Sequence, residues 1–560
     1  MLKRTLMSLA VSSMALSGVA QANERVILEE LGRYETGVFD DGASEIVAYD
    51  KDGFRLYVIN AGAGTVDILG IADPTDPQLE GQIDVTTDIT EAGGINSVAV
   101  SKGLVAIAVE NDDKQAAGWV AFYDTDGNFL GDSEAGALPD SLTFSPNGKY
   151  VVVANEGEPS DDYSVDPEGS ITIIDLNGGF ESRSVTHATF TAFNDQPLPD
   201  GLRAPRPFGA TLAQDLEPEF AAVSRDSSTA FVTLQENNGV AVVDLASGTV
   251  SALLGLGTQD HSLPDNGLDA SNEDGEVNIQ NWPVMGLYMP DTINGYRYRG
   301  VQYYVTANEG DGREYIFETD EEDCTSRGFE FDEGECLSYI DETRVGDVTL
   351  NEAAFSDLSA FGVNSIEELQ MDENLGRIKM VSTEGMNESG EYEAIYTFGT
   401  RSFTIWSDSG ELVYDSGDVM EQVTSELEGC DGSDLDLCGF NSTNDENGSF
   451  DDRSDDKGPE PEVVVVGKNN GQAFAFVGLE RVGGIMIFNV SDAANPVFVG
   501  YEPARDFDPS LDVESQDAGD LGPEGMVFIR KGASPIGKSL LVVGNEVSGT
   551  TTIYRVKAQR

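Results

Sequence analysis

The chain repeats one pattern, in which a run of apolar and β-branched residues leads through a polar or glycine-rich elbow into a second such run. Clear copies are YVVVANEGEP with GSITIIDL, AFVTLQENNGVAVVDL, and LLVVGNEVSGTTTIYRV at residues 540–556. Runs of this composition bounded by turn residues predict pairs of neighbouring strands. Eight such hairpins occur, two of them, at 55–71 and 394–407, in a looser form. The repeat therefore predicts an all-β chain.

A further apolar strand precedes most hairpins and opens with its own short signature, as in GASEIVAY (42–49), GPEPEVVVV (458–466) and GPEGMVFI (522–529). Three strands with room for a fourth, recurring every few tens of residues, are typical of a β-propeller blade. We predict a single β-propeller with seven or eight four-stranded blades. Eight follow if each hairpin is one blade, and seven follow if a terminal hairpin shares a blade or an insertion mimics one.

Long acidic, glycine-rich stretches interrupt the repeat, but no change of composition marks a boundary between domains. We predict that they are loop insertions in one propeller domain spanning residues 23–560. They lie at about 177–213, 246–280, 316–347 and 416–458.

The N-terminus has the features of a secretory signal peptide. Lys3 and Arg4 precede an apolar stretch that ends in the small-x-small site Ala20-Gln21-Ala22. We predict a signal peptide over residues 1–22 and export to the periplasm or the extracellular space. The apolar stretch is too short to span a bilayer, and no apolar C-terminal tail is present, so we expect no transmembrane anchor.

The charge of the chain restricts its partners. It has 101 acidic and 32 basic residues, a formal net charge of −69. Such a charge repels phosphate backbones and anionic lipid surfaces, so we expect no nucleic acid partner. A solvated surface suited to salty water accounts for most of the excess, because salt screens repulsion over ~10 Å or less. It does not account for acids at fixed positions in a repeat, which indicate a divalent cation.

The four cysteines form two close pairs, Cys324 with Cys336 and Cys430 with Cys438, each in a polar, acidic loop. In an exported chain this arrangement predicts two local disulfides. A zinc site is the alternative, but the short C-x-x-C spacing is missing and the chain has only two histidines.

Acids recur at the two ends of the predicted channel-lining hairpin. In a propeller blade the first strand lines the channel and the second returns antiparallel beside it, so the start of one and the end of the other share the channel face. The resulting pairs are Glu524 with Glu546, Asp140 with Glu156, Glu217 or Glu219 with Glu236, and Glu460 or Glu462 with Glu480. Because clustered carboxylates repel, we expect a hard cation among them, Ca²⁺ by its preference for oxygen ligands. The candidate metal ligands are Glu156, Glu219, Glu236, Glu309, Glu462, Glu480, Glu524 and Glu546.

Three of the rare basic residues, Arg313, Arg401 and Arg481, fall at the same elbows. They are candidates for contact with an anionic ligand, because guanidinium groups bind carboxylates and phosphates in a bidentate manner. The alternative is structural: the elbow acids pair with these arginines and accept hydrogen bonds from turn amides.

Several ordered segments, among them NWPVMGLYMPD, TANEGDGREY, GLERVGGIMIFNV and LGPEGMVFI, resemble the choice-of-anchor I domain family. That family includes bacterial proteins labelled alkaline-phosphatase-like and an animal cell surface glycoprotein. The resemblance covers residues 25 to 556 and implies an exported, propeller-like protein, often attached to the surface by varied C-terminal signals. This sequence departs from that pattern, because it ends at its last predicted strand.

Two classes of function are compatible with these features. The first is an exported acidic β-propeller that binds a divalent cation and a small anionic ligand, a glycan or a protein at the channel face. The alternative is a calcium-dependent alkaline phosphatase or phosphodiesterase-like hydrolase, in which the cation neutralises phosphate and the arginines hold its oxygens. The chain has no G-x-S-x-G motif and no histidine cluster for such chemistry.

Overall fold

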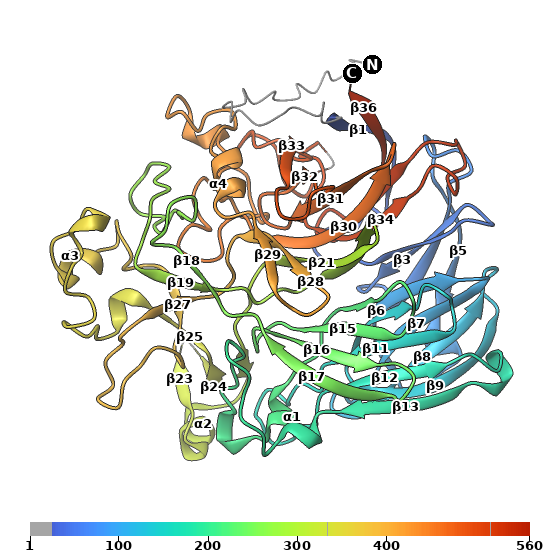
Figure 1. Cartoon of the computed structure of the whole chain (residues 1–560), viewed down its shortest axis with the longest axis horizontal. Helices are drawn as coiled ribbons and strands as arrows, with labels where there is room; N and C mark the ends of the chain where they lie inside the picture. The colour runs from blue at the N-terminus through green and yellow to red at the C-terminus, as the bar shows by residue number, and fades with distance from the viewer. Residues whose placement is uncertain (1–24, 333, 516, 560) are drawn as a thin grey trace.

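The computed structural model describes residues 25–332, 334–515 and 517–559, so the predicted signal peptide lies outside the described residues. The fold is an all-β propeller, as predicted (Figure 1). Within the described residues, seven antiparallel sheets have four strands each.

The first four of these sheets are continuous in sequence. They are β2 (Val47–Asp50), β3 (Arg55–Asn60), β4 (Thr65–Gly70) and β5 (Gln78–Asp84); β6 (Ala92–Ser101), β7 (Leu104–Asn111), β8 (Ala117–Asp124) and β9 (Phe129–Ala137); β10 (Pro139–Phe144), β11 (Tyr150–Asn155), β12 (Ser170–Asp175) and β13 (Ser184–Thr189); and β14 (Ala221–Val223), β15 (Thr229–Leu234), β16 (Gly239–Asp244) and β17 (Thr249–Gly255).

The other three sheets use strands that are distant in sequence or follow a long insertion. They are β20 (Ile293–Tyr298), β21 (Val301–Asn308), β28 (Ser402–Ser407) and β29 (Leu412–Asp415); β30 (Pro461–Asn469), β31 (Gln472–Leu479), β32 (Ile485–Asn489) and β33 (Val497–Glu502); and β34 (Pro523–Ile529), β35 (Leu540–Asn545), β36 (Thr550–Gln559) and β1 (Arg25–Glu35).

The sheets follow one another around a ring. The first strand of each sheet contacts the first strand of the next, in the cycle β2, β6, β10, β14, β20, β30, β34 and back to β2. The last sheet joins the two ends of the chain, because β1 pairs with β36 from Arg25↔Gln559 to Glu35↔Thr550. Figure 1 shows these two strands side by side.

The core lies between neighbouring sheets, which explains why the middle strands are apolar on both faces. In β31, Phe474 and Phe476 pack toward β35, whereas Ala475 and Val477 pack toward β28. Successive side chains of a strand point to opposite faces, so a strand with a sheet on either side becomes a continuous apolar run.

Two of the eight predicted hairpins belong to a single sheet, because the insertion at 309–401 separates two of its paired strands in the sequence. Strand β21 pairs with β28, with Tyr303 opposite Ser407, so the segments at 303–314 and 394–407 contribute to one sheet. Two other predicted loop insertions contain the outermost strand of a sheet. Strand β13 lies within 177–213 and β17 within 246–280. Strand β13 is largely polar and exposed, so its sequence resembles a loop, whereas β17 is more apolar and mostly half-buried.

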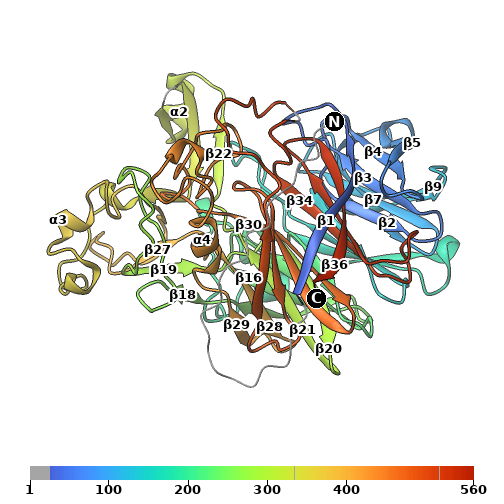
Figure 2. The same cartoon turned by 90° about the horizontal axis from the view of Figure 1, so that it is seen from above.

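The remaining elements are short and lie mostly in the insertions. They are β18 (Thr258–Asp260), β19 (Val284–Leu287) and β27 (Ile395–Thr397); β22 (Glu314–Phe317), β23 (Glu330–Asp332) and β24 (Glu335–Ile340); β25 (Glu342–Arg344) and β26 (Lys379–Val381); and the helices α1 (Leu212–Asp215), α2 (Glu321–Arg327), α3 (Ile366–Leu369) and α4 (Val419–Thr424). Figure 2 shows α2, α3 and β27 on the opposite side of the molecule from β3 to β5.

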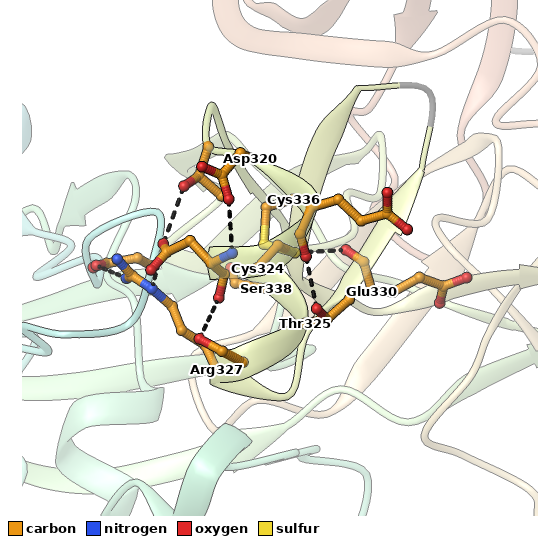
Figure 3. Close-up of a disulfide and its surroundings, with 12 residues drawn as sticks. Asp320, Cys324, Thr325, Arg327, Glu330, Cys336 and Ser338 are labelled. Atoms are coloured by element: carbon orange, nitrogen blue, oxygen red, sulfur yellow. Dashed lines mark hydrogen bonds and ion pairs between the residues drawn. A yellow bond between two sulfur atoms is a disulfide. The ribbon is translucent and has the colours of Figure 1, made fainter.

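Both predicted disulfides are present. Cys324 in α2 is joined to Cys336 in β24 (Figure 3), and Cys430 is joined to Cys438 in the segment after α4. Beside the first disulfide, Arg327 forms an ion pair of 2.8 Å with Asp162, in the loop after β11. No helix among the described residues is both long enough and apolar enough to cross a membrane.

Candidate cation site at the mouth cavity

The strand registers place acids in pairs at one end of the ring. Strand β10 pairs with β11 through Pro139↔Asn155, so Asp140 and Glu156 each lie one residue from that pair. The same arrangement recurs in the last sheet, where Pro523↔Asn545 lies beside Glu524 and Glu546. The Pro461↔Leu479 pair likewise lies beside Glu462 and Glu480. The register shifts just after the proline in all three sheets, and such bulges redirect nearby side chains.

A cavity of about 310 Å³, here called the mouth cavity, receives acids from several sheets. Its acidic lining residues are Glu45, Asp140, Glu219, Asp291, Glu524 and Glu546. Glu45 and Asp291 were not among the residues predicted from the sequence. Each lies two residues before the first strand of its sheet, as Glu219 does before β14, so their position relative to the repeat could have identified them.

Asp140, Glu156 and Glu219, here called the open cluster, have carboxylate oxygens within 4.8 Å of one another. None of the three side chains has a hydrogen bond or an ion pair to any described residue. Burial and the neighbouring carboxylates raise the pKa of all three groups well above the usual range. Repulsion within the cluster is therefore not relieved by the chain itself.

Glu309, Glu460 and Glu480, here called the paired cluster, are equally close, again within 4.8 Å. Each has a basic partner, and the contacts are Lys457 to Glu309 at 2.5 Å, Arg453 to Glu460 at 2.6 Å and Arg481 to Glu480 at 3.0 Å. The chain thus supplies its own cations here. Neither Lys457 nor Arg453 was singled out from the sequence, because they lie in the insertion before β30.

The three candidate arginines all have acidic partners within the chain. Arg313 contacts Glu217 at 2.7 Å and Asp215 at 3.3 Å, and its side chain is 2% exposed. Arg401 contacts Glu421 at 2.6 Å and donates to three backbone carbonyl oxygens. Only Arg481, whose side chain is 30% exposed, is accessible to solvent. Glu217 and Glu480, the partners of Arg313 and Arg481, belong to the predicted acid pairs, whereas Glu421, the partner of Arg401, lies in α4.

The remaining predicted ligands lie beside the two clusters. Burial raises the pKa of Glu462 well above the usual range, and repulsion from Glu309 and Asp291 adds to the shift. Burial also raises the pKa of Glu236 to about 7, and its Oε2 atom is buried without a hydrogen-bond partner. Burial raises the pKa of Glu524 well above the usual range, and repulsion from Glu546 adds to the shift.

The donor set of the open cluster suits a hard cation. It consists of carboxylate oxygens alone, the ligands that Ca²⁺ prefers, and lacks the nitrogen and sulfur donors typical of zinc. Clustered carboxylates without basic partners are stabilised either by protons or by a bound cation.

The sequence comparison identifies the family. A model of the choice-of-anchor I domain matches residues 45–493. The chain belongs to the choice-of-anchor I domain family. Family membership and the two disulfides indicate that this choice-of-anchor I protein is exported.

Two relatives show similarity over part of this choice-of-anchor I chain. Gigasin-3a of Magallana gigas is 29% identical over 198 residues, which cover 34% of this chain and 68% of the relative. A mesenchyme-specific cell surface glycoprotein of Strongylocentrotus purpuratus is 29% identical over 317 residues, covering 54% of this chain and 38% of the relative. The match thus spans well under half of that glycoprotein.

Among solved structures, the hydrazine synthase of Kuenenia stuttgartiensis aligns with a TM-score of 0.43 at 12% identity, over 94% of this chain and 100% of the other. The Cps50 (Swd1) β-propeller domain of Myceliophteria thermophila aligns with a TM-score of 0.41 at 8% identity, over 95% and 100%.

Proposed function

We propose that this exported β-propeller binds a divalent cation, Ca²⁺, through Asp140, Glu156 and Glu219, and that the bound ion presents a binding position in the mouth cavity. The observation that carries the proposal is the contrast between the two clusters. Both bring three carboxylates within 4.8 Å, but only the paired cluster has basic partners in the described part of the chain. The open cluster has the same repulsion and no internal cation to offset it.

The position of the open cluster supports a role in binding rather than in stability alone. Asp140 and Glu219 line the mouth cavity, so an ion held by them faces a space of about 310 Å³. Ca²⁺ takes six to eight oxygen ligands, whereas three carboxylates supply three to six. A bound ion would keep positions for water or for an oxygen of a ligand. A small anionic ligand, or a glycan or protein that offers carboxylate or hydroxyl oxygens, fits such an ion.

This proposal keeps Glu156 and Glu219 from the eight candidate ligands and adds Asp140, the predicted partner of Glu156. Glu480 belongs to the paired cluster, where Arg481 is 3.0 Å away. We do not extend the proposal to phosphoester hydrolysis, since Arg313 and Arg401 contact internal acids and carbonyl groups.

The test compares Glu219→Gln with Glu480→Gln, a matched variant in the paired cluster. Ca²⁺ at 100-fold excess over its dissociation constant should stabilise the wild-type protein by about 2.7 kcal/mol. We expect Glu219→Gln to weaken Ca²⁺ binding at least about tenfold, because affinity depends on ligand charge. Glu480→Gln should lower stability without weakening this binding. Thermal unfolding and isothermal titration with Ca²⁺ measure both effects.

The proposal is wrong if the melting temperature of the wild type responds neither to Ca²⁺ nor to a chelator. It is also wrong if the two variants lose Ca²⁺ affinity equally, since that result would reflect general charge rather than a site.

A further inference from the structure

A second buried polar network joins the segment 416–458 to the loop between β18 and β19, and the proposed function does not use it. Its members are each at most 5% exposed. They are Asp269, Arg401, Glu421, Asn441, Asp451 and Ser454.

The charges in this network do not balance. Arg401 neutralises Glu421 across 2.6 Å, and Arg401 otherwise donates to backbone oxygens. The carboxylates of Asp269 and Asp451 have no ion pair within the described residues. Asp269 does accept hydrogen bonds from the backbone amides of Ser271 and Asn278, but these donors carry no net charge. When ionised, these two buried carboxylates have no counter-charge within the described residues.

Two buried oxygen atoms also have no donor. Ser454 Oγ donates to Asp451 Oδ1, which leaves Asp451 Oδ2 without a partner. Asn441 Nδ2 donates to Glu421 Oε1 and to Ser454 Oγ, both at 2.8 Å. Because a carboxylate beside an ion-paired arginine only accepts, the NH₂ group of Asn441 must face Glu421, which fixes the amide orientation. Asn441 Oδ1 is then an acceptor without a donor.

The side chains of Asn441 and Asp451 each form a hydrogen bond with Ser454 Oγ, so both are held beside the same hydroxyl group. Burying polar atoms without partners is costly, and native structures rarely tolerate it. A water molecule would supply hydrogen bonds but would leave both negative charges. A hard divalent cation satisfies the oxygens and the charges together. Both residues also have left-handed backbone angles, with φ of +40° at Asn441 and +73° at Asp451. Such strain in non-glycine residues persists where the surroundings hold it.

We propose that Asp451 and Asn441, with Asp269 as the second carboxylate, hold a structural divalent cation, of which Ca²⁺ is the test case. The ion fastens the segment 416–458 to the loop between β18 and β19. A proton is the rival occupant, because burial and the nearby Asp269 raise the pKa of Asp451 to about 9. The site does not depend on the open cluster, and either can be present without the other.

The experiment counts bound calcium in the full mature protein. Protein unfolded in chelator is refolded with or without Ca²⁺, desalted, and measured by native mass spectrometry and elemental analysis. The variants are Asp451→Asn, Asp455→Asn as the matched control, and Glu219→Gln for the open cluster. Asp455 is in the same segment and is 4% exposed, but contacts Arg344 at 2.6 Å and Arg377 at 3.0 Å.

We expect Asp451→Asn to bind one Ca²⁺ fewer per chain than wild type, and Asp455→Asn to bind the wild-type number. Because the ion is enclosed, it should survive desalting, whereas an ion in the open cluster should exchange. Glu219→Gln should therefore retain the enclosed ion. If Asp451→Asn fails to refold, Asn441→Ala should show the same loss of one ion.

The proposal is overturned if wild type refolded with Ca²⁺ retains no ion after desalting, or if Asp451→Asn or Asn441→Ala retains the wild-type number. Asp451→Asn as stable as wild type, with no response to Ca²⁺ beyond that of the open cluster, would assign the site to a proton. Loss of the retained ion in Glu219→Gln, with Asp451→Asn keeping it, would place that ion in the open cluster; this result would overturn the enclosed site and leave the proposed function standing.

Discussion

Lys457 marks the difference between the two carboxylate clusters at the scale of single residues. Its Nζ atom lies 2.5 Å from Glu309 and 3.6 Å from Glu460. The lysine lies in an insertion rather than in the repeat, so the repeat gathers acids in several sheets and the insertion neutralises one group of them. An enclosed ammonium group can thus take the position that a metal ion is proposed to take elsewhere.

Replacing Lys457 by Met should turn the paired cluster into a second open one. Removing one partner of a buried ion pair costs about 3 kcal/mol or more, since the remaining charge has no partner. We expect urea unfolding to show this loss in chelator and a partial recovery in Ca²⁺, with one more ion bound than in wild type. An equal loss under both conditions would show that a divalent cation cannot replace the lysine.

At the scale of elements, the sheet β22–β24–β23 depends on the disulfide between Cys324 and Cys336. The sheet lies in the insertion at 309–401 and contacts the loop after β11 through Ser338 and Tyr315, while Arg327 in α2 forms an ion pair with Asp162 in that loop. Closing a loop between cysteines that have a sequence separation of 12 stabilises by roughly 3 kcal/mol in the chain-entropy model. The benefit should be local, because the pairing of β21 with β28 does not pass through this sheet.

Removing this disulfide, by Cys324→Ser with Cys336→Ser, should raise proteolytic cleavage within 314–344 on the order of 100-fold, because a local loss of roughly 3 kcal/mol increases the open population by that factor. The main urea transition should move little. Removing the disulfide between Cys430 and Cys438 serves as the control and should leave cleavage in 314–344 unchanged. Equal cleavage in both variants would contradict a local role.

The elements also show what sequence can and cannot reveal. Strands such as β31 were predictable because both faces are buried and the run is apolar throughout. Exposed outer strands such as β13 were assigned to loops, since polar residues dominate them. The joining of β21 to β28 had no local signal, because the partners are separated by the whole insertion.

Part of the candidate site was likewise predictable from the sequence and part was not. The acid pairs followed from strand register, which a repeat makes visible. Their counter-charges did not follow, since Lys457, Arg453 and the acids around Arg401 meet only in the folded chain.

At the scale of the whole molecule, the mouth of the ring should make stability depend on pH. Burial raises the pKa of Glu45 to about 8, and that of Asp291 and Glu236 to about 7. The folded state therefore binds more protons than the unfolded state between roughly pH 4 and these values. Over that pH range the free energy of unfolding falls as pH rises. The slope is about 1.4 kcal/mol per pH unit for each group that is protonated in the folded state and ionised in the unfolded state.

In chelator, we expect the free energy of unfolding to be higher at pH 5.5 than at pH 8, measured by urea unfolding. Ordinary surface carboxylates do not titrate in this interval, so the general charge of the chain does not produce the effect. Ca²⁺ should reduce the difference, because a bound ion replaces the protons. Equal stability at the two pH values in chelator would contradict the raised pKa values of these groups.

The pairing of β1 with β36 sets the time at which the ring can close. Arg25 is opposite Gln559, so β1 waits for a partner that is synthesised after all the strands of the other six sheets. Until then six sheets can assemble as an open arc, but the last sheet lacks β36, and β1 has no strand with which to pair. Contacts of such long sequence separation form slowly. The contacts that close the ring through this sheet therefore form after the other six sheets have been synthesised, so the ring becomes rigid late in folding.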